Sequence, residues 1–219
     1  MKKLLTLALM AIITLGATAQ VRTSRTFTHV KKTTWYLRAG MNFSTPSSIK
    51  TDEDNSAYTT YDANSKVGFD VDFGFQKKIG TSNAYWGMEL GVGTRGVDVK
   101  EFYDGEENED FDGSCTALGI TYSPITFGYK YSLTDNIKLD GHLGAFLSYD
   151  LGSIGSYSYE LDNSFDAGMQ IGVGVWFSHV NLDFTYQAGF CNAFNGDELD
   201  YVKDSCKIGK FMIRLGYAF

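Results

Sequence analysis

The stretch that decides the fold reads Phe211-Met212-Ile213-Arg214-Leu215-Gly216-Tyr217-Ala218-Phe219. Successive side chains of a β-strand point to opposite faces, so residues two apart share a face. One face of this stretch carries Phe211, Ile213, Leu215, Tyr217 and Phe219, and the other carries Lys210, Met212, Arg214, Gly216 and Ala218. The alternation predicts a strand with one apolar and one polar face.

The same alternation recurs in seven segments upstream. They cover residues 35–43, 67–76, 86–93, 116–131, 137–149, 167–177 and 181–190. The segment 116–131 changes phase at Ser123-Pro124, where a β-bulge would accommodate a residue that has no backbone N–H. With the last stretch, the chain has eight predicted strands, an even number.

The connections between these segments alternate in length. Residues 77–83, 132–136 and 178–179 make short connections, whereas 44–65, 96–114, 152–164 and 192–205 make long, polar ones. Short turns at one end and long loops at the other are typical of transmembrane barrels. The pattern predicts an all-β fold over residues 33–219, an eight-stranded antiparallel transmembrane β-barrel with short periplasmic turns and long extracellular loops.

The first residues have the form of an export signal. Met1-Lys2-Lys3 precedes an apolar run over 4–15, and Gly16-Ala17-Thr18-Ala19 follows it. A basic start, a short apolar run and a small-x-small site are typical of a secretory signal peptide. The run is also shorter than the roughly 20 residues that span a bilayer as a helix. We predict a signal peptide over 1–19, a periplasmic lead-in over 20–32, and a final location in the outer membrane.

Composition agrees with long strands and argues against one class of partner. The chain has 24 Gly, 16 Phe and 14 Tyr but only 2 Pro. Few prolines suit strands, because proline removes a donor from the hydrogen-bond ladder. The net charge is −7. Nucleic acid is therefore not an expected partner, since phosphate binding needs a basic surface.

Alternation alone does not say which face of the barrel points inward. A soluble periplasmic lipocalin-like carrier would turn its apolar face inward to hold a greasy ligand. The polar face is rich in Gly, which suits a crowded lumen, and it carries both signs of charge, which suits an enclosed space. We therefore predict a luminal charge network of Arg38, Asp70, Asp72, Glu89, Arg95, Lys138, Asp140, Asp183, Lys210 and Arg214.

Aromatic residues near the short-turn ends of the strands favour the membrane arrangement. Such residues form interfacial girdles around transmembrane barrels. The predicted girdle consists of Trp35, Trp86, Tyr129, Tyr131 and Phe177, joined by Tyr217 and Phe219.

Two stretches carry a family resemblance. Phe211, Ile213, Leu215, Tyr217 and Phe219 look like the C-terminal signature that barrel-assembly machinery recognises. The stretch Leu118-Gly119-Ile120-Thr121-Tyr122-Ser123-Pro124-Ile125-Thr126-Phe127 is similar to the central strand of PorT-like proteins, although Pro124 stands later than in their common Leu-x-Ile-Pro-Leu pattern. The chain thus resembles PorT-like and OmpX-like members of the "outer membrane protein beta-barrel domain" family. The resemblance implies contacts with outer-membrane lipids and with the assembly machinery, and it leaves function open.

The sequence offers little for catalysis. Its three histidines are His29, His142 and His179, and nucleophilic catalysis needs a Ser or Cys beside a His that a carboxylate orients. His142 faces the lumen two residues from Asp140, which could orient it. A luminal His among charges is more often structural. We predict no enzymatic activity, no catalytic residue and no cofactor.

Two further features have both a functional and a plainer interpretation. The acidic run 101–112 could collect Ca²⁺ through its carboxylates, but its spacing does not fit an EF-hand and a solvated loop is the simpler interpretation. No metal site is predicted. Cys191 and Cys206 flank the last long loop, so a cross-strand disulfide between them is geometrically feasible, and Cys115 would remain as a third thiol.

The function that follows is a structural, adhesive or complex-forming one, exerted through extracellular loops and an unidentified extracellular or envelope partner. An eight-stranded barrel has an interior just wide enough to be filled by side chains, whereas diffusion porins use about 16–18 strands. A narrow porin-like channel and the soluble carrier are the alternatives.

Overall fold

The computed structural model describes residues 33–47, 59–103, 106–108, 115–153, 164–192 and 207–219. The chain divides into two compact units, Met1–Lys31 and Lys32–Phe219, and the described residues all belong to the second. The predicted signal peptide and lead-in fall outside the described residues and stay predictions. No helix within the described ranges is long and apolar enough to cross a membrane.

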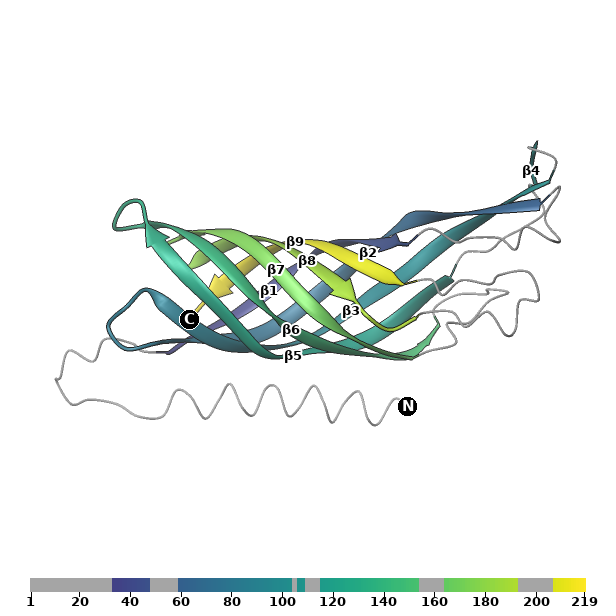
Figure 1. Ribbon diagram of the computed structural model, residues 1–219. Helices are drawn as coiled ribbons and strands as arrows, with labels where there is room; N and C mark the ends of the chain where they lie inside the picture. Colours follow the sequence, from purple (N-terminus) through teal and green to yellow (C-terminus); the bar gives the residue numbers. More distant parts are fainter. Residues whose placement is uncertain (1–32, 48–58, 104–105, 109–114, 154–163, 193–206) are drawn as a thin grey trace. The chain divides into compact units, whose positions relative to one another are not determined.

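Eight strands form one closed antiparallel sheet (Figure 1). They are β1 (Thr33–Pro46), β2 (Thr59–Lys78), β3 (Ala84–Tyr103), β5 (Cys115–Ser132), β6 (Ile137–Ser153), β7 (Phe165–Phe177), β8 (Val180–Gly189) and β9 (Ile208–Ala218). Each strand pairs with its neighbours in the order β2-β1-β9-β8-β7-β6-β5-β3, and β2 also pairs with β3. That last pairing closes the barrel. The predicted fold is confirmed.

The last strand completes the wall by pairing with the first. Met41 of β1 lies opposite Phe69 of β2 on one side and Ile213 of β9 on the other. All three side chains belong to the apolar face, so the register keeps that face continuous around the barrel. A slip of one residue would place the apolar set of a strand on the wrong face.

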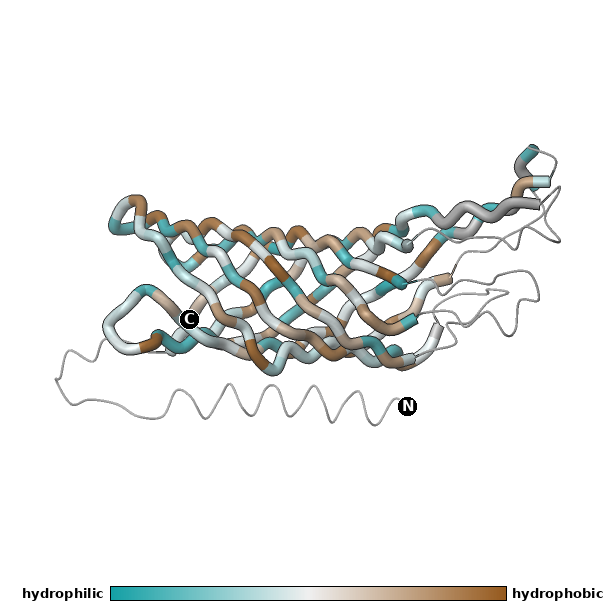
Figure 2. Tube along the Cα trace, in the orientation of Figure 1, coloured by the Kyte–Doolittle hydropathy of each residue, from teal (hydrophilic) through white to brown (hydrophobic). Residues whose placement is uncertain are grey.

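The apolar side chains point out of the barrel and the polar ones point in. Ile171 is 64% exposed and Leu215 is 61% exposed, whereas Arg214, the residue just before Leu215 in β9, is 1% exposed. Figure 2 shows hydrophobic and hydrophilic residues alternating along the strands. A soluble carrier would have the opposite arrangement, with apolar side chains inside. That alternative is therefore wrong for this chain.

The predicted bulge at Ser123-Pro124 is confirmed. Tyr122 lies opposite Leu147 of β6, but Ile125 lies opposite Ala145, so β5 has one residue more than its partner over this interval. The pairing of β5 with β3 shifts at the same place. Such a bulge leaves one residue unpaired, which is where a proline is tolerated.

The short connections are turns, as predicted, and the two-residue turn at Ser178 and His179 joins β7 to β8. Ser178 has a φ of 54°, the only positive φ at a non-glycine residue in the described part of the chain. Turns that join adjacent antiparallel strands favour such a conformation because its twist matches that of the strands.

The expectation of loops over all of 44–65 and 96–114 is wrong. β2 and β3 continue beyond the rest of the barrel as a two-stranded ribbon, in which Ser65 pairs with Val97 and Thr59 pairs with Tyr103. The short strand β4 (Glu106–Glu107) adds to the end of β3. Figure 1 shows this ribbon projecting from one end of the barrel. A ribbon outside the membrane needs no apolar face, so its polar sequence resembles that of a loop.

Candidate functional site

The lumen is filled by inward side chains from all eight strands. Two of the cavities in the described part of the interior measure about 10 Å³ and about 20 Å³. A cavity of that size holds roughly one water molecule. The interior is therefore a packed polar core, and its charged side chains are the candidate site. All of the predicted luminal charges are buried except Lys138, which is half-exposed.

Arg214 of β9 forms the centre of the buried network. Its Nη1 donates to Asp72 Oδ2 and to Glu89 Oε1, both at 2.8 Å. Its Nη2 lies 2.6 Å from Asp183 Oδ1. The three carboxylates come from β2, β3 and β8. The planar guanidinium presents five N–H donors in a fixed geometry, so one side chain can join three strands across the lumen.

Arg38 of β1 extends the same network. Its Nη1 donates to Glu89 Oε2 at 3.0 Å, and its Nε donates to Asn181 Oδ1 at 3.0 Å. The guanidinium also lies 4.4 Å from the ring centroid of Tyr36, whose hydroxyl donates to Glu89 at 2.9 Å. Two guanidiniums thus share the buried Glu89, which is how confined charges can be tolerated.

Two further ion-pair groups lie toward the long-loop end. Lys210 Nζ is 2.7 Å from Asp70 Oδ1. Arg95 is 2.6 Å from Asp150 and 3.1 Å from Asp166. Asp150 and Asp166 were missed by the sequence reading, although extending the alternation by one residue at each strand end would have placed them in the lumen.

Side chains replace backbone hydrogen bonds where the β2–β3 ladder is interrupted. The register shifts between Ser65 and Asp70. There, Asn42 Nδ2 donates to the backbone carbonyls of Phe69 at 3.0 Å and Thr94 at 2.8 Å. The Phe69 N–H donates to Thr94 Oγ1 at 3.0 Å. Asn42, which is 0% exposed, therefore holds together two strands that have lost their regular pairing.

The short-turn end of the lumen is closed by aromatic side chains. Tyr85 Oη donates to Asp140 Oδ1 at 2.7 Å, and Trp176 Nε1 donates to Asp140 Oδ2 at 2.9 Å. Lys130 Nζ lies 3.8 Å from the ring centroid of Trp176 and 5.3 Å from that of Tyr85. We call Tyr85, Trp176 and Asp140 the mouth cage. A Cβ at Gly128 would collide with the Tyr85 ring, so glycine there leaves the space that this ring fills.

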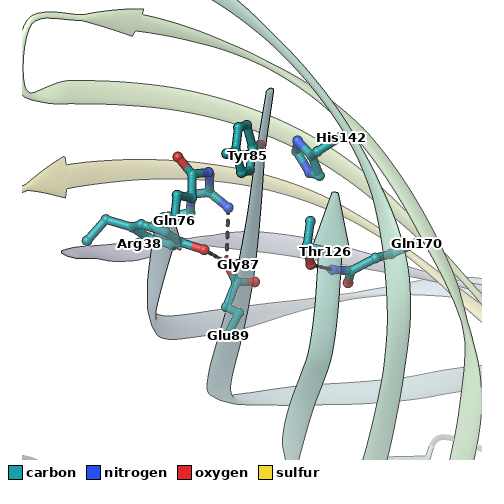
Figure 3. A pocket seen from close by; sticks show the side chains of 9 residues that line it. Arg38, Gln76, Tyr85, Gly87, Glu89, Thr126, His142 and Gln170 are labelled. Atoms are coloured by element: carbon teal, nitrogen blue, oxygen red, sulfur yellow. Dashed lines mark hydrogen bonds and ion pairs between the residues drawn. The ribbon is translucent and has the colours of Figure 1, made fainter. Parts of the chain in front are cut away.

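His142 is bound to Thr185 rather than to Asp140. Its Nε2 is 3.1 Å from Thr185 Oγ1, and Thr185 in turn donates to Asp183 Oδ1 at 2.8 Å. Asp140 is engaged by the mouth cage, so the expectation that it orients His142 is wrong. Figure 3 shows His142, with Gln170 and Thr126, around the smaller cavity. His179 lies in a turn and His29 falls outside the described residues.

The other predicted residues lie on the outer wall. In the predicted girdle, Tyr129, Tyr131 and Phe177 are exposed, while Trp35 and Trp86 are half-exposed and pack against Phe75. The outward residues of the C-terminal signature are Phe211, Ile213, Leu215, Tyr217 and Phe219. Their recognition by assembly machinery stays a prediction.

The predicted disulfide and the acidic run are only partly described. Cys191 has a free thiol, and Cys206 lies outside the described residues, so their pairing stays a prediction. Residues 104–105 and 109–112 of the acidic run also lie outside the described residues. Within the described ranges, no group of three His, Cys, Asp or Glu side chains could hold a metal ion.

Residues 18–195 match a protein family described as "Outer membrane protein beta-barrel domain". The chain belongs to this family. The outer membrane protein beta-barrel domain accounts for most of the chain, and the predicted location in the outer membrane, among its lipids, is confirmed. The finer resemblance to PorT-like and OmpX-like proteins stays a prediction. No curated protein sequence matches the chain.

Several solved outer-membrane proteins are similar in structure to this family member. OprG from Pseudomonas aeruginosa is 15% identical, with 85% of this chain and 95% of OprG covered and a TM-score of 0.46. Ail, the attachment invasion locus protein of Yersinia pestis, is 15% identical, with 86% and 99% covered and a TM-score of 0.41. Neisserial surface protein A is 14% identical, with 84% and 95% covered and a TM-score of 0.43. At these identities no residue role is transferred.

Proposed function

We propose that this outer-membrane barrel is a non-enzymatic protein with a structural, adhesive or complex-forming role, exerted outside the membrane. The observation that carries the proposal is the contrast between the closed lumen and the ribbon that projects from the barrel. The lumen is closed by buried ion pairs, while β2 and β3 continue past the barrel as a ribbon. The ribbon, which lies outside the barrel, is therefore the surface that we expect to bind a partner.

The packed lumen favours this role over a narrow channel. Arg38 and Arg214 cross the interior and bind carboxylates from three other strands. An ion path would require these buried side chains to leave their partners, and breaking a buried ion pair is costly. The cavities of about 10 Å³ and about 20 Å³ that adjoin charged luminal side chains each hold roughly one water molecule.

The ribbon supports a partner-binding role through its edge. The pairing of β1 with β2 ends at Ser44 and Lys66, and no strand among the described residues pairs with the outer edge of β2 over residues 59–65. The backbone N–H and C=O groups of such an edge can pair with an extended segment of another chain. Tyr103, 62% exposed at the other strand's end, adds an aromatic side chain to this surface.

Photo-crosslinking in cells tests the proposal. A photo-reactive phenylalanine placed at Tyr103 should give discrete adducts, whereas the same residue at Tyr131 should not. The two tyrosines are matched, because they are 62% and 60% exposed at opposite ends of the barrel. Absence of any adduct at Tyr103 would count against a partner on the ribbon.

A second measurement addresses the channel alternative. The purified protein in planar bilayers should show no steady conductance, because the buried ion pairs block the interior. A stable, ohmic conductance that disappears when Arg38, Glu89 and Arg214 are replaced together would reverse the choice between the two functions.

A further inference from the structure

The mouth cage surrounds a cation without giving it a hydrogen bond. The Lys130 ammonium lies over the face of Trp176, with its nitrogen 3.8 Å from the ring centroid. Tyr85 is the second ring, at 5.3 Å. Cations within about 6 Å of an aromatic face are attracted by the ring, and tryptophan attracts them most strongly. Within the described chain, no hydrogen bond or salt bridge holds the Lys130 ammonium.

The cage is assembled by groups other than Lys130. Each oxygen of Asp140 accepts a hydrogen bond, one from Tyr85 and one from Trp176. Trp176 also packs edge-on against Tyr36, with centroids 6.4 Å apart. Tyr85, Trp176 and Asp140 are 2%, 4% and 3% exposed. Both rings would therefore keep their positions if the lysine left.

Lys130, in contrast, can leave. It lies two residues before the end of β5 and is half-exposed, and its flexible four-carbon stem can turn the ammonium toward water. A primary ammonium carries three N–H donors, and those of Lys130 make no hydrogen bond to Asp140 or to any other described residue. In water those donors would be satisfied. A quaternary ammonium has no N–H group, so it suits this site better than the lysine does.

We propose that the mouth cage is a binding site for quaternary ammonium groups, and that the Lys130 side chain is the internal occupant that such a ligand displaces. The negative charge of Asp140, to which both rings donate hydrogen bonds, adds to the attraction of the two rings. The ligand class is an alkyl trimethylammonium group, carried by a free solute such as choline or by a lipid headgroup.

Displacement can be measured on the unaltered protein. Tetramethylammonium should expose Lys130 and raise its rate of acylation by an amine-reactive reagent, by about tenfold at saturation if the ring contacts shield it as their strength suggests. Lys77, which is exposed, is the internal control and should not change. Sodium chloride at equal ionic strength should have no effect, and neither should 3,3-dimethylbutan-1-ol, the uncharged isostere of choline. An unchanged Lys130 rate in tetramethylammonium would overturn the proposal.

Substitutions give an independent test. Lys130→Ala empties the cage and should bind choline about tenfold more tightly than the unaltered chain, whereas Lys130→Met refills it with an uncharged side chain and should not. Adding Trp176→Leu to Lys130→Ala should abolish binding. Folding of each variant is checked by its migration before and after boiling, in a maltoside detergent that carries no ammonium group. Equal binding by the alanine and methionine variants would overturn the proposal.

The source of the ammonium group is decided with vesicles. Lys130 is acylated in phosphatidylcholine vesicles and in phosphatidylglycerol vesicles, with and without free choline. A higher rate in phosphatidylcholine alone identifies a lipid headgroup, and a rise only on adding choline identifies a solute, so both support the proposal. No rise in any arm overturns it.

Discussion

At the scale of single residues, the buried charged side chains differ in how many ion-pair partners each has. Arg214 forms ion pairs with three carboxylates and is 1% exposed, whereas Lys210 forms one ion pair within the described residues, with Asp70, and is 9% exposed. Removing one member of a buried ion pair is costly because it leaves an uncompensated charge. The cost should therefore grow with the number of partners left behind.

Replacing Arg214 tests this directly. Arg214→Met should lower the free energy of unfolding by about 3–5 kcal/mol, because it strands buried carboxylates. Arg214→Lys keeps the charge but loses the planar guanidinium, so its free energy of unfolding should lie between those of the unaltered protein and Arg214→Met. Lys210→Met is the matched control and should cost clearly less. Urea unfolding in lipid vesicles measures all three, and an Arg214→Met protein as stable as the Lys210→Met one would contradict the expectation.

Two glycines of the wall should respond differently to the same change. A Cβ at Gly128 would overlap the Tyr85 ring, whereas a Cβ at Gly141 meets nothing within 4 Å. Gly128→Ala should destabilise the barrel by about 1–3 kcal/mol through overpacking. Gly141→Ala should be close to neutral. Equal unfolding midpoints for the two variants would show that the lumen has more room at the mouth than the structure indicates.

Alternation in the sequence predicts which residues face the lumen, but not which of them meet. The position of Asp140 two residues from His142 made a contact between them feasible, yet Asp140 binds Tyr85 and Trp176 on other strands. Contacts across a barrel depend on strand stagger and closure, which alternation within one strand does not contain. Trp176 was missed because aromatic residues near strand ends are expected outside, in the girdle.

At the scale of elements, the interruption between β2 and β3 separates the barrel wall from the ribbon. Asn42 of β1 binds both strands at that point. Among the described strand pairings, the ribbon beyond it is held by its own cross-strand bonds and by the pairing of Val97 with Cys115 of β5. The interruption is thus where motion of the ribbon would be limited.

Removing the Asn42 side chain should loosen this point without opening the barrel. Asn42→Ala should speed amide hydrogen exchange in residues 65–70 and 94–97, because the backbone carbonyls of Phe69 and Thr94 lose the donor that bridges them. Asn64→Ala, at an exposed position of the ribbon, is the control. Exchange in β7 and β8 should stay slow. Unchanged exchange at 65–70 would show that the backbone holds this region unaided.

Elements differ in how far the sequence predicts them. The bulge in β5 was predicted, because Pro124 coincides with a change of phase that has no other explanation within a strand. The ribbon was not, because the signal used for strands is an apolar face, and residues 59–65 and 97–103 pair outside the region where one is required. A strand within the membrane can be recognised by its apolar face, whereas a strand outside the membrane has no such face.

At the scale of the whole molecule, the outward apolar surface predicts that a charged substitution destabilises the barrel more the deeper it lies in the membrane. Leu143, in the middle of the apolar face of β6, is 54% exposed, and Tyr131, beside a short turn, is 60% exposed. In lipid vesicles Leu143→Arg should cost about 2–4 kcal/mol and Tyr131→Arg about 0–1 kcal/mol, because a charge is costly only where water is absent. Reversible unfolding measures both. Similar costs at the two positions would contradict the proposed membrane placement.

The place of β9 in the closed sheet also bears on the order in which the molecule can form. β9 brings Lys210 and Arg214, and the carboxylates that they neutralise stand on β2, β3 and β8. Until β9 is in place, those carboxylates lack part of their positive partners. They must then stay hydrated, so the interior cannot yet exclude water. Stepwise addition of hairpins from β1 onward is therefore unfavourable, because each intermediate would hold unpaired carboxylates. The partners are also far apart in sequence, which slows their encounter. Dehydration of the interior and closure of the wall should occur together, as one late event set by the last strand to arrive.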